Sequence, residues 1–146
     1  MRYLLVNGPN LNTLGTREPQ IYGHDTLAEV VSRVTQRAAE LGVEIDAFQS
    51  NHEGAIIDYL QANTGKADGM VINPGGMAHT SLVLRDAITA CQIPTVEVHI
   101  SNIHAREPFR HESLLTAVCR GMVTGLGWRG YVYALEYLVA EGASKK

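Results

Sequence analysis

The sequence predicts an α/β fold, in which a doubly wound sheet of parallel strands carries helices on both faces. Short apolar runs alternate with longer stretches in which apolar residues recur every three or four positions. Capping residues precede several of the longer stretches, as at helix starts. The 146 residues suit one domain, 1–146, and contain no repeat or low-complexity segment. Such alternation favours right-handed βαβ units, and therefore a parallel sheet of five strands in the order 2-1-3-4-5.

The first half of the chain predicts two strands with a helix between them. Residues 2–7 are a continuous apolar run that Gly8-Pro9 ends, as in a buried strand. Thr26-Leu27-Ala28-Glu29 is a capping box, and apolar residues follow at helical spacing until Gly42. Residues 43–48 then form the second strand.

A second helix and a third strand follow. Ser50-Asn51-His52-Glu53 has the form of another capping box, and Ile56, Ile57 and Leu60 continue it at helical spacing. Residues 69–73 form the third strand, which is apolar up to Asn73.

The remaining elements repeat this alternation. Thr80 or Ser81 caps a helix that runs to about Cys91, and residues 95–100 form the fourth strand after Pro94. The fifth strand, 120–124, lies among glycines. A last helix carries Tyr131, Leu135, Leu138 and Val139, and residues 142–146 are expected to be a disordered polar tail.

Composition and charge exclude several classes of protein. The net charge of -3 and the pI near 6.0 argue against nucleic-acid binding, because the arginines are scattered. No apolar run approaches the roughly 20 residues that cross a bilayer, and residues 1–8 read as a strand and not as a signal peptide. Cys91 and Cys119 are distant in the sequence, which suits reduced thiols in a cytoplasmic protein.

Polar side chains follow three of the predicted strands. Asn7-Gly8-Pro9-Asn10 follows the first strand, Asn73-Pro74-Gly75-Gly76 follows the third, and His99-Ile100-Ser101-Asn102 stands at the end of the fourth. Because doubly wound sheets bind ligands at the carboxyl ends of their strands, these clusters predict one site at that edge.

The segment 9–25 is predicted to be a lid over this edge, because long aperiodic loops in compact domains are commonly functional. It contains Tyr22, and a tyrosine can act as a base when nearby positive charge lowers a pKa that is ordinarily about 10. Arg17 lies five residues upstream of it, and Arg106 and Arg110 follow the fourth strand.

Histidines at the same edge offer acid–base chemistry without a cofactor. His79 and His99 follow strands, and neither belongs to a spacing that is typical of metal sites. No glycine-rich phosphate-binding motif is present, so nucleotide binding is not expected. Lys66 is the only lysine outside the carboxyl-terminal pair, and it precedes the third strand, at the opposite end of the sheet.

Taken together, these residues resemble the type II 3-dehydroquinate dehydratase family. The similar segments cover nearly the whole chain, and they are Asn7-Gly8-Pro9-Asn10-Leu11, Gly15-Thr16-Arg17-Glu18-Pro19, Ile21-Tyr22-Gly23, Ile72-Asn73-Pro74-Gly75, His79-Thr80-Ser81, Glu97-Val98-His99-Ile100-Ser101-Asn102, Arg106-Glu107 and Gly125-Leu126-Gly127. The Gly76-Met77-Ala78 stretch departs from the family, in which an aromatic residue and a threonine often stand before the histidine, and Thr13 replaces a residue that is frequently apolar.

The resemblance implies a flavodoxin-like fold and a hydro-lyase reaction, the dehydration of 3-dehydroquinate to 3-dehydroshikimate in the shikimate pathway of aromatic amino-acid and chorismate biosynthesis. It implies that Tyr22 is the base, that Arg17 and Arg106 lower the pKa of that base, and that Asn10 holds a water on the enolate. It requires no metal or other cofactor.

The resemblance also implies an acid and a binding site. His99 would protonate the leaving hydroxyl, and Glu97 would orient His99. The substrate-binding residues would be Asn73, His79, Ile100, Ser101 and Arg110, with Asp86 from a neighbouring subunit. Asp86 lies about 200° around its helix from the core-facing Leu84, so it should point away from its own core. The family further implies a homododecamer built as a tetramer of trimers.

Three alternatives stay open at this point. The same reaction serves quinate catabolism. A flavin-binding electron carrier has the same predicted fold, although Gly8-Pro9-Asn10-Leu11 offers little to a flavin phosphate. A non-catalytic binding protein would explain the polar edge of the sheet but not an acid–base pair.

Overall fold

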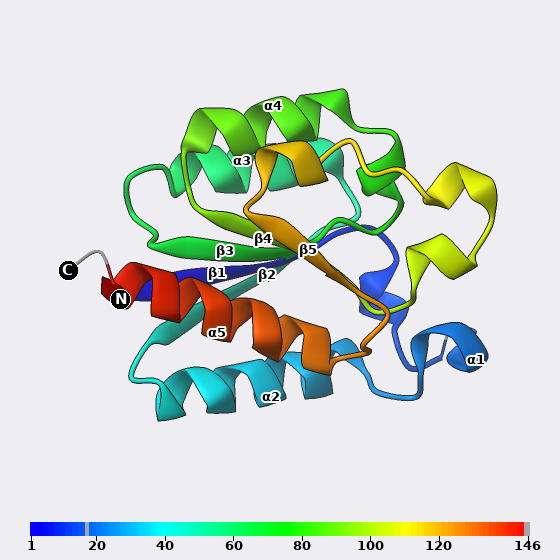
Figure 1. The fold of residues 1–146 in the computed structure, drawn as a ribbon, viewed down its shortest axis with the longest axis horizontal. Helices are drawn as coiled ribbons and strands as arrows, with labels where there is room; N and C mark the ends of the chain where they lie inside the picture. The colour runs from blue at the N-terminus through cyan, green and yellow to red at the C-terminus, as the bar shows by residue number, and fades with distance from the viewer. Residues whose placement is uncertain (17, 145–146) are drawn as a thin grey trace.

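The computed structural model describes residues 1–16 and 18–144, in which five parallel strands lie between two layers of helices (Figure 1). The strands are β1 (Arg2–Asn7), β2 (Glu44–Gln49), β3 (Gly69–Asn73), β4 (Thr95–His99) and β5 (Gly121–Thr124). Their order is β2-β1-β3-β4-β5, and every neighbouring pair is parallel. The predicted fold class and strand order are therefore confirmed.

Helices cover both faces of the sheet, so each face has its own core. Below the sheet in Figure 1 lie α2 (Leu27–Glu40) and α5 (Arg129–Ser144), and above it lie α3 (Glu53–Ala62) and α4 (Leu82–Cys91). Alternate residues of β1 point to opposite faces: Leu5 packs with the α2–α5 core, and Leu4 with the α3–α4 core. Burial of the central strands on both faces explains why they read as continuous apolar runs.

The strand register brings the ends of the central strands together. Asn7 pairs with Asn73 across β1 and β3, so two amide side chains end neighbouring strands at the carboxyl edge of the sheet. His99 pairs with Thr124 at the same edge of β4 and β5. The polar clusters predicted after these strands therefore do meet there.

Two of the three predicted helix caps form. Thr26 accepts a hydrogen bond from the Glu29 amide at 3.2 Å, and Ser81, not Thr80, accepts one from the Leu84 amide at 3.0 Å. The capping box at Ser50 does not form, because α3 begins only at Glu53 and its N-cap is His52. The Glu53 carboxylate instead accepts a hydrogen bond from the Ser81 hydroxyl at 2.5 Å.

The predicted lid is more ordered than an aperiodic loop. It contains a 3₁₀ turn at Leu11–Thr13 and the short helix α1 (Pro19–Tyr22), which lies beyond the carboxyl edge of the sheet (Figure 1). Leu11 and Leu14 are buried in the α2–α5 core, so the first part of the segment is anchored. The other 3₁₀ helices are Gly75–His79, Ile103–Ala105, Pro108–Arg110 and Thr116–Val118.

Part of the segment predicted to be a disordered carboxyl-terminal tail is helical. Helix α5 continues through residues 142–144, so this part of the expected tail is helical, and residues 145–146 lie outside the described part of the chain. Among the helices of the described residues, none combines the length and the apolar character that a membrane crossing would require.

Candidate active site

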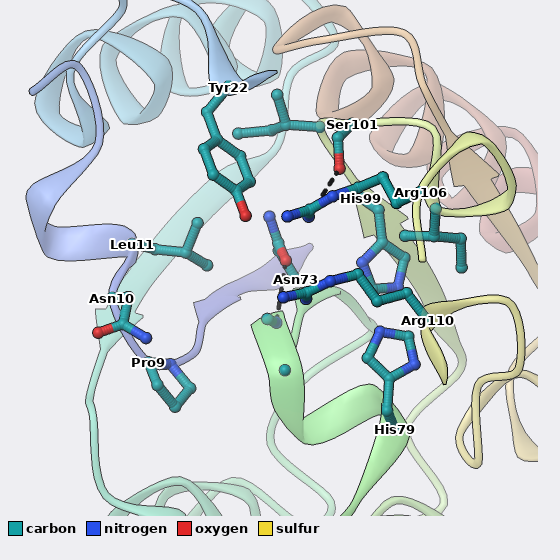
Figure 2. A pocket seen from close by; sticks show the side chains of 14 residues that line it. Pro9, Asn10, Leu11, Tyr22, Asn73, His79, His99, Ser101, Arg106 and Arg110 are labelled. Carbon is teal, nitrogen blue, oxygen red and sulfur yellow. Dashed lines mark hydrogen bonds between the residues drawn. The ribbon is translucent and has the colours of Figure 1, made fainter. Parts of the chain in front are cut away.

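A cavity of about 150 Å³ opens at the carboxyl ends of β1, β3 and β4, where the sequence predicted a site (Figure 2). Most of the predicted site residues line it, and they are Asn10, Tyr22, Asn73, His79, His99, Ile100, Ser101, Arg106 and Arg110. The lid, the turn after β3 and the segment after β4 thus contribute side chains to one space.

The floor of the cavity is formed where the turns after β1 and β3 touch. The Gly8 amide donates a hydrogen bond to the Asn73 carbonyl at 2.8 Å. A Cβ atom at Gly8 would lie 2.5 Å from the Pro74 carbonyl oxygen, and one at Gly75 would lie 3.1 Å from the Pro9 carbonyl oxygen. Only glycine permits so close an approach of two backbones at position 8.

Asn73 is held in the floor by a buried polar chain. Its Nδ2 donates to the Tyr131 hydroxyl at 2.8 Å, and its Oδ1 accepts from the Gly75 amide at 3.1 Å. The Tyr131 hydroxyl in turn donates to Asn7 Oδ1 at 2.7 Å. Burial raises the pKa of Tyr131 despite the hydrogen bond from Asn73, so this phenol stays a neutral donor and fixes the Asn73 amide.

His99 lies at the end of β4 with Glu97 behind it. The distance from His99 Nε2 to Glu97 Oε2 is 2.5 Å, and both side chains are buried. Burial alone would raise the pKa of Glu97, but hydrogen bonds from His99, Thr116 and Ser113 together with the charge of His99 outweigh it and lower this pKa. An ionised carboxylate behind the ring is the arrangement that orients an imidazole and stabilises its protonated form.

His79 faces the same cavity beside His99. The two ring centroids are 6.3 Å apart, and His79 Nδ1 lies 2.7 Å from the Glu112 carbonyl oxygen. Because a carbonyl oxygen can only accept, Nδ1 must carry the hydrogen, and Nε2 of a neutral His79 is then an acceptor. His79 therefore suits the binding of a hydroxyl group.

Tyr22 and Arg106 enter the cavity together (Figure 2). The Arg106 guanidinium carbon lies 5.2 Å from the centroid of the Tyr22 ring, within the range of a cation–π contact. Arg106 Nη1 also donates to the Ser101 hydroxyl at 3.4 Å, which holds the guanidinium near the cavity. Arg110 pairs with Glu107 at 3.0 Å, and that pair leaves Arg110 at the cavity wall.

Two of the predicted site residues that the structure describes do not line the cavity. Glu97 stands behind His99, as the resemblance implied. Asp86 is exposed on α4, which confirms that it points away from its own core. Arg17 lies outside the described residues.

Asn10 occupies the left-handed region with φ 70°, and its amide donates to Asn51 Oδ1 at 2.9 Å. This conformation turns the chain away from β1 into the lid, and Asn10 lines the cavity from there.

Sequence reasoning missed the groups that support Glu97 and Asn73. Ser113 and Thr116 contact the Glu97 carboxylate from an irregular segment, where two hydroxyl residues carry no signal beyond their polarity. Tyr131 was predicted only as a core residue of the last helix, although a tyrosine in a core position requires a partner for its hydroxyl. Among the described residues, no group of three or more His, Cys, Asp or Glu side chains is placed to hold a metal ion.

Comparison with known proteins shows the family of the chain. The family described as Dehydroquinase class II matches residues 1–139. The 3-dehydroquinate dehydratase of Roseiflexus castenholzii is 52% identical over 95% of this chain and 88% of that protein. The catabolic 3-dehydroquinase of Penicillium rubens is 50% identical over 98% of this chain and 92% of that protein.

Solved structures give the same result. The crystal structure of the type II dehydroquinase from Butyrivibrio crossotus has a TM-score of 0.92 and 44% identity, over 94% of this chain and 97% of that one. Sequence and fold thus agree along nearly the whole length, and the chain belongs to the class II dehydroquinase family.

Proposed function

We propose that this protein is a hydro-lyase that dehydrates 3-dehydroquinate to 3-dehydroshikimate and water. The observation that carries the proposal is the pairing of His99 with the buried Glu97 at 2.5 Å, in the same cavity as Tyr22 and Arg106. Removing water from a β-hydroxy ketone requires a base at the carbon acid, an acid at the leaving hydroxyl and stabilisation of the enolate oxygen. Each role has a candidate in this cavity.

Tyr22 is the proposed base, which takes the proton from C2 of the ring. Arg106 stands 5.2 Å from the Tyr22 ring centroid, and its positive charge stabilises the phenolate that the step requires. Arg17 is proposed to act with it. Asn10, which lines the cavity, is proposed to hold a water against the enolate oxygen.

His99 is the proposed acid, which gives a proton to the departing C1 hydroxyl. Its Nε2 is occupied by Glu97, so Nδ1 is the ring nitrogen left for the substrate. Proton removal and hydroxyl departure on opposite faces of the ring, as an anti elimination through an enolate, suit a base on the lid and an acid on the sheet.

The remaining cavity residues are proposed to bind the substrate. The carboxylate would be bound by Asn73 and the amides of Ile100 and Ser101, and the ring hydroxyls by His79 and Arg110. The Asn73 side chain is suited to this role because Tyr131 and the Gly75 amide already hold it.

The test is an ultraviolet assay of enone formation with metal-stripped protein and 3-dehydroquinate. Tyr22→Phe and His99→Ala should each lower kcat by about 100-fold or more, because general acid–base groups typically contribute 10²–10⁴. His79→Ala should raise KM more than it lowers kcat. Arg17→Ala should slow turnover and move the acidic limb of the pH profile of kcat to higher pH. Tyr137→Phe and His52→Ala, at exposed positions, are the matched controls. A Tyr22→Phe enzyme with nearly normal kcat would require another base.

Catalysis is proposed to need neither an imine nor a metal. Lys66 lies beside Arg2 at the start of β1, at the end of the sheet opposite the cavity, since its carbonyl accepts from Arg2 Nη1 at 3.2 Å. Borohydride added with substrate should therefore leave activity intact. A reduced adduct on Lys66 that abolishes turnover would contradict the proposal.

We propose that the active protein is a homododecamer, a tetramer of trimers, in which Asp86 reaches a neighbour's substrate. Asp86 is exposed, and the adjacent Leu82 and Val83 on α4 are 63% and 50% exposed, an apolar surface that self-association would cover. Light scattering tests the oligomer. Asp86→Ala and His99→Ala subunits, unfolded and reassembled together, should exceed the mean activity of the parents. If subunits exchange and activity equals that mean, Asp86 does not act across the interface.

The proposed setting is the shikimate pathway in the cytoplasm. The thiols of Cys91 and Cys119 are free, as suits a reducing compartment. Quinate breakdown is the second candidate, because the relative from Penicillium rubens is named catabolic. Deletion of the gene decides between them: loss of growth without aromatic amino acids supports biosynthesis, and loss of growth on quinate alone supports catabolism.

A further inference from the structure

The Glu97 carboxylate is surrounded by neutral hydroxyl groups in addition to His99. Ser113 Oγ lies 2.9 and 2.8 Å from its two oxygens, and Thr116 Oγ1 donates to Oε1 at 2.6 Å. Glu97 itself is 0% exposed, so it is buried from bulk solvent. Neither hydroxyl residue lines the cavity, and both come from the segment after the Pro108–Arg110 turn.

These hydroxyls contact the same carboxylate that is hydrogen-bonded to His99. Among the described residues, His99 is the only basic side chain within ion-pair distance of Glu97. A fully buried carboxylate whose sole hydrogen-bond partner was a neutral imidazole would tend to take up a proton. Hydrogen bonds to its oxygens lower the pKa of Glu97 and so favour the ionised carboxylate.

The position of that proton sets what His99 offers to the cavity. With Nε2 bonded to Glu97, Nδ1 faces the substrate and becomes a donor only when the ring is positively charged. An ionised Glu97 favours that charged form. Transfer of the proton to Glu97 would instead leave a neutral ring that has no proton to give.

The same short segment also fixes the second histidine. The Glu112 carbonyl accepts from His79 Nδ1 at 2.7 Å, and the Leu114 amide donates to the Ala78 carbonyl at 2.7 Å. Residues 112–116 are therefore bonded to the turn that carries His79 and to the carboxylate that supports His99.

We propose that Ser113 and Thr116 are positioning residues, whose hydroxyls keep Glu97 a proton acceptor and thereby keep His99 a competent acid. The proposal rests on the proposed dehydration, in which His99 protonates the leaving group. It assigns the two hydroxyls to the chemical step, and not to substrate binding.

Thr116→Val is the principal test, because valine has nearly the shape of threonine and carries a methyl group in place of the hydroxyl. It should lower kcat about tenfold, the effect of losing one hydrogen bond to a charged group, and change KM less than twofold. Thr116→Ser, which restores the hydroxyl, should recover most of the activity. Ser113→Ala should act in the same direction, although Ser113 Oγ also accepts from the Leu115 amide at 3.1 Å.

A double-mutant cycle separates this role from general structural support. In a Glu97→Gln background there is no carboxylate to keep ionised, so Thr116→Val should cause less than a twofold further loss of kcat. An undiminished tenfold loss in that background would overturn the proposal, because it would show that Thr116 acts independently of Glu97.

A spectroscopic measurement on the ligand-free protein tests the proton position without turnover. In ¹⁵N NMR at neutral pH, the His99 ring should show a protonated Nε2 in the unsubstituted protein and a changed protonation pattern in Thr116→Val. Unchanged ring shifts together with unchanged kcat would refute the role of the hydroxyls. If the unsubstituted protein does not dehydrate 3-dehydroquinate, the proposed function fails, and the NMR comparison still decides whether the hydroxyls place the proton.

Discussion

Replacing Tyr131 with phenylalanine should destabilise the protein and weaken substrate binding. The Tyr131 hydroxyl lies in a fully buried side chain and joins Asn7 to Asn73 through hydrogen bonds of 2.7 and 2.8 Å. Phenylalanine keeps the ring in the α2–α5 core and removes only this link. The Asn7 side chain then loses a hydrogen-bond donor and the Asn73 side chain an acceptor, and both side chains are buried.

The size of the effect follows from those two bonds. Each neutral hydrogen bond contributes about 1 kcal/mol net, and buried partners left unpaired add to the loss, so the free energy of unfolding should fall by about 2–3 kcal/mol. For a domain of this size, that corresponds to a lowering of Tm by about 5–10 °C. Since Asn73 loses one of its two anchors, KM for 3-dehydroquinate should rise about three- to tenfold.

Tyr3→Phe is the matched control in the thermal assay. Tyr3 is also fully buried in the α2–α5 core, but its hydroxyl has no hydrogen-bond partner among the described residues. Its removal should leave Tm unchanged or slightly higher. Equal shifts of Tm in the two variants, or an unchanged KM in Tyr131→Phe, would refute the assignment of Tyr131 as the anchor of Asn73.

Three further predictions concern stability and reactivity. Burial raises the pKa of Glu97, but its hydrogen bonds and the charge of His99 outweigh burial and lower this pKa below the ordinary 4.5. The ionised Glu97 carboxylate therefore stabilises the folded protein fully above pH 4.5. This stabilisation is lost as the pH falls through the lowered pKa of the folded state. Urea denaturation should thus show a shallower loss of stability below about pH 4.5 in Glu97→Gln than in the unsubstituted protein, and equal slopes would contradict this. Burial, followed by the charge of Glu97, raises the pKa of Cys119 to about 12, so iodoacetamide at pH 8 should label it far more slowly in folded than in urea-unfolded protein. Fast labelling of the folded thiol would show that this environment is wrong. Gln92 ends α4 in the left-handed region at φ 56°, which glycine adopts without strain. Gln92→Gly should therefore raise the free energy of unfolding by about 0.5–1 kcal/mol, and a Tm that does not rise would argue against strain at this position.

The regular part of the fold could be predicted because hydrophobic periodicity and strand order follow from local sequence and chain topology. The failures lie where tertiary contacts overrode a local pattern. Ser50 and Glu53 have capping-box spacing, yet the Glu53 carboxylate pairs with Ser81 of another helix, and α3 starts at Glu53. The lid resembled a plain loop because short turns have no period, whereas Leu11 and Leu14 anchor it in the core.

The residues lining the site were predictable to the extent that they follow strands. Parallel strands end at one edge, so Asn73 and His99 had to meet there once the order was known. The supporting residues were not predictable in this way. Ser113 is 16 positions from Glu97, and Tyr131 is 58 positions from Asn73, so only the folded chain brings these hydroxyls to their partners.

The mutual contact of the turns after β1 and β3 determines which parts of the pocket can be redesigned. Any side chain at position 8 would collide with the Pro74 carbonyl, and Gly75 combines a positive φ of 59° with a tight but less severe contact, 3.1 Å from the Pro9 carbonyl oxygen. The floor therefore has a single admissible backbone path. Variant libraries aimed at other hydroxy acids should keep positions 8, 74 and 75 and the proposed catalytic residues Tyr22 and Arg106 constant. They should diversify the rest of the lid and of residues 100–110, because those walls can change shape without displacing a strand.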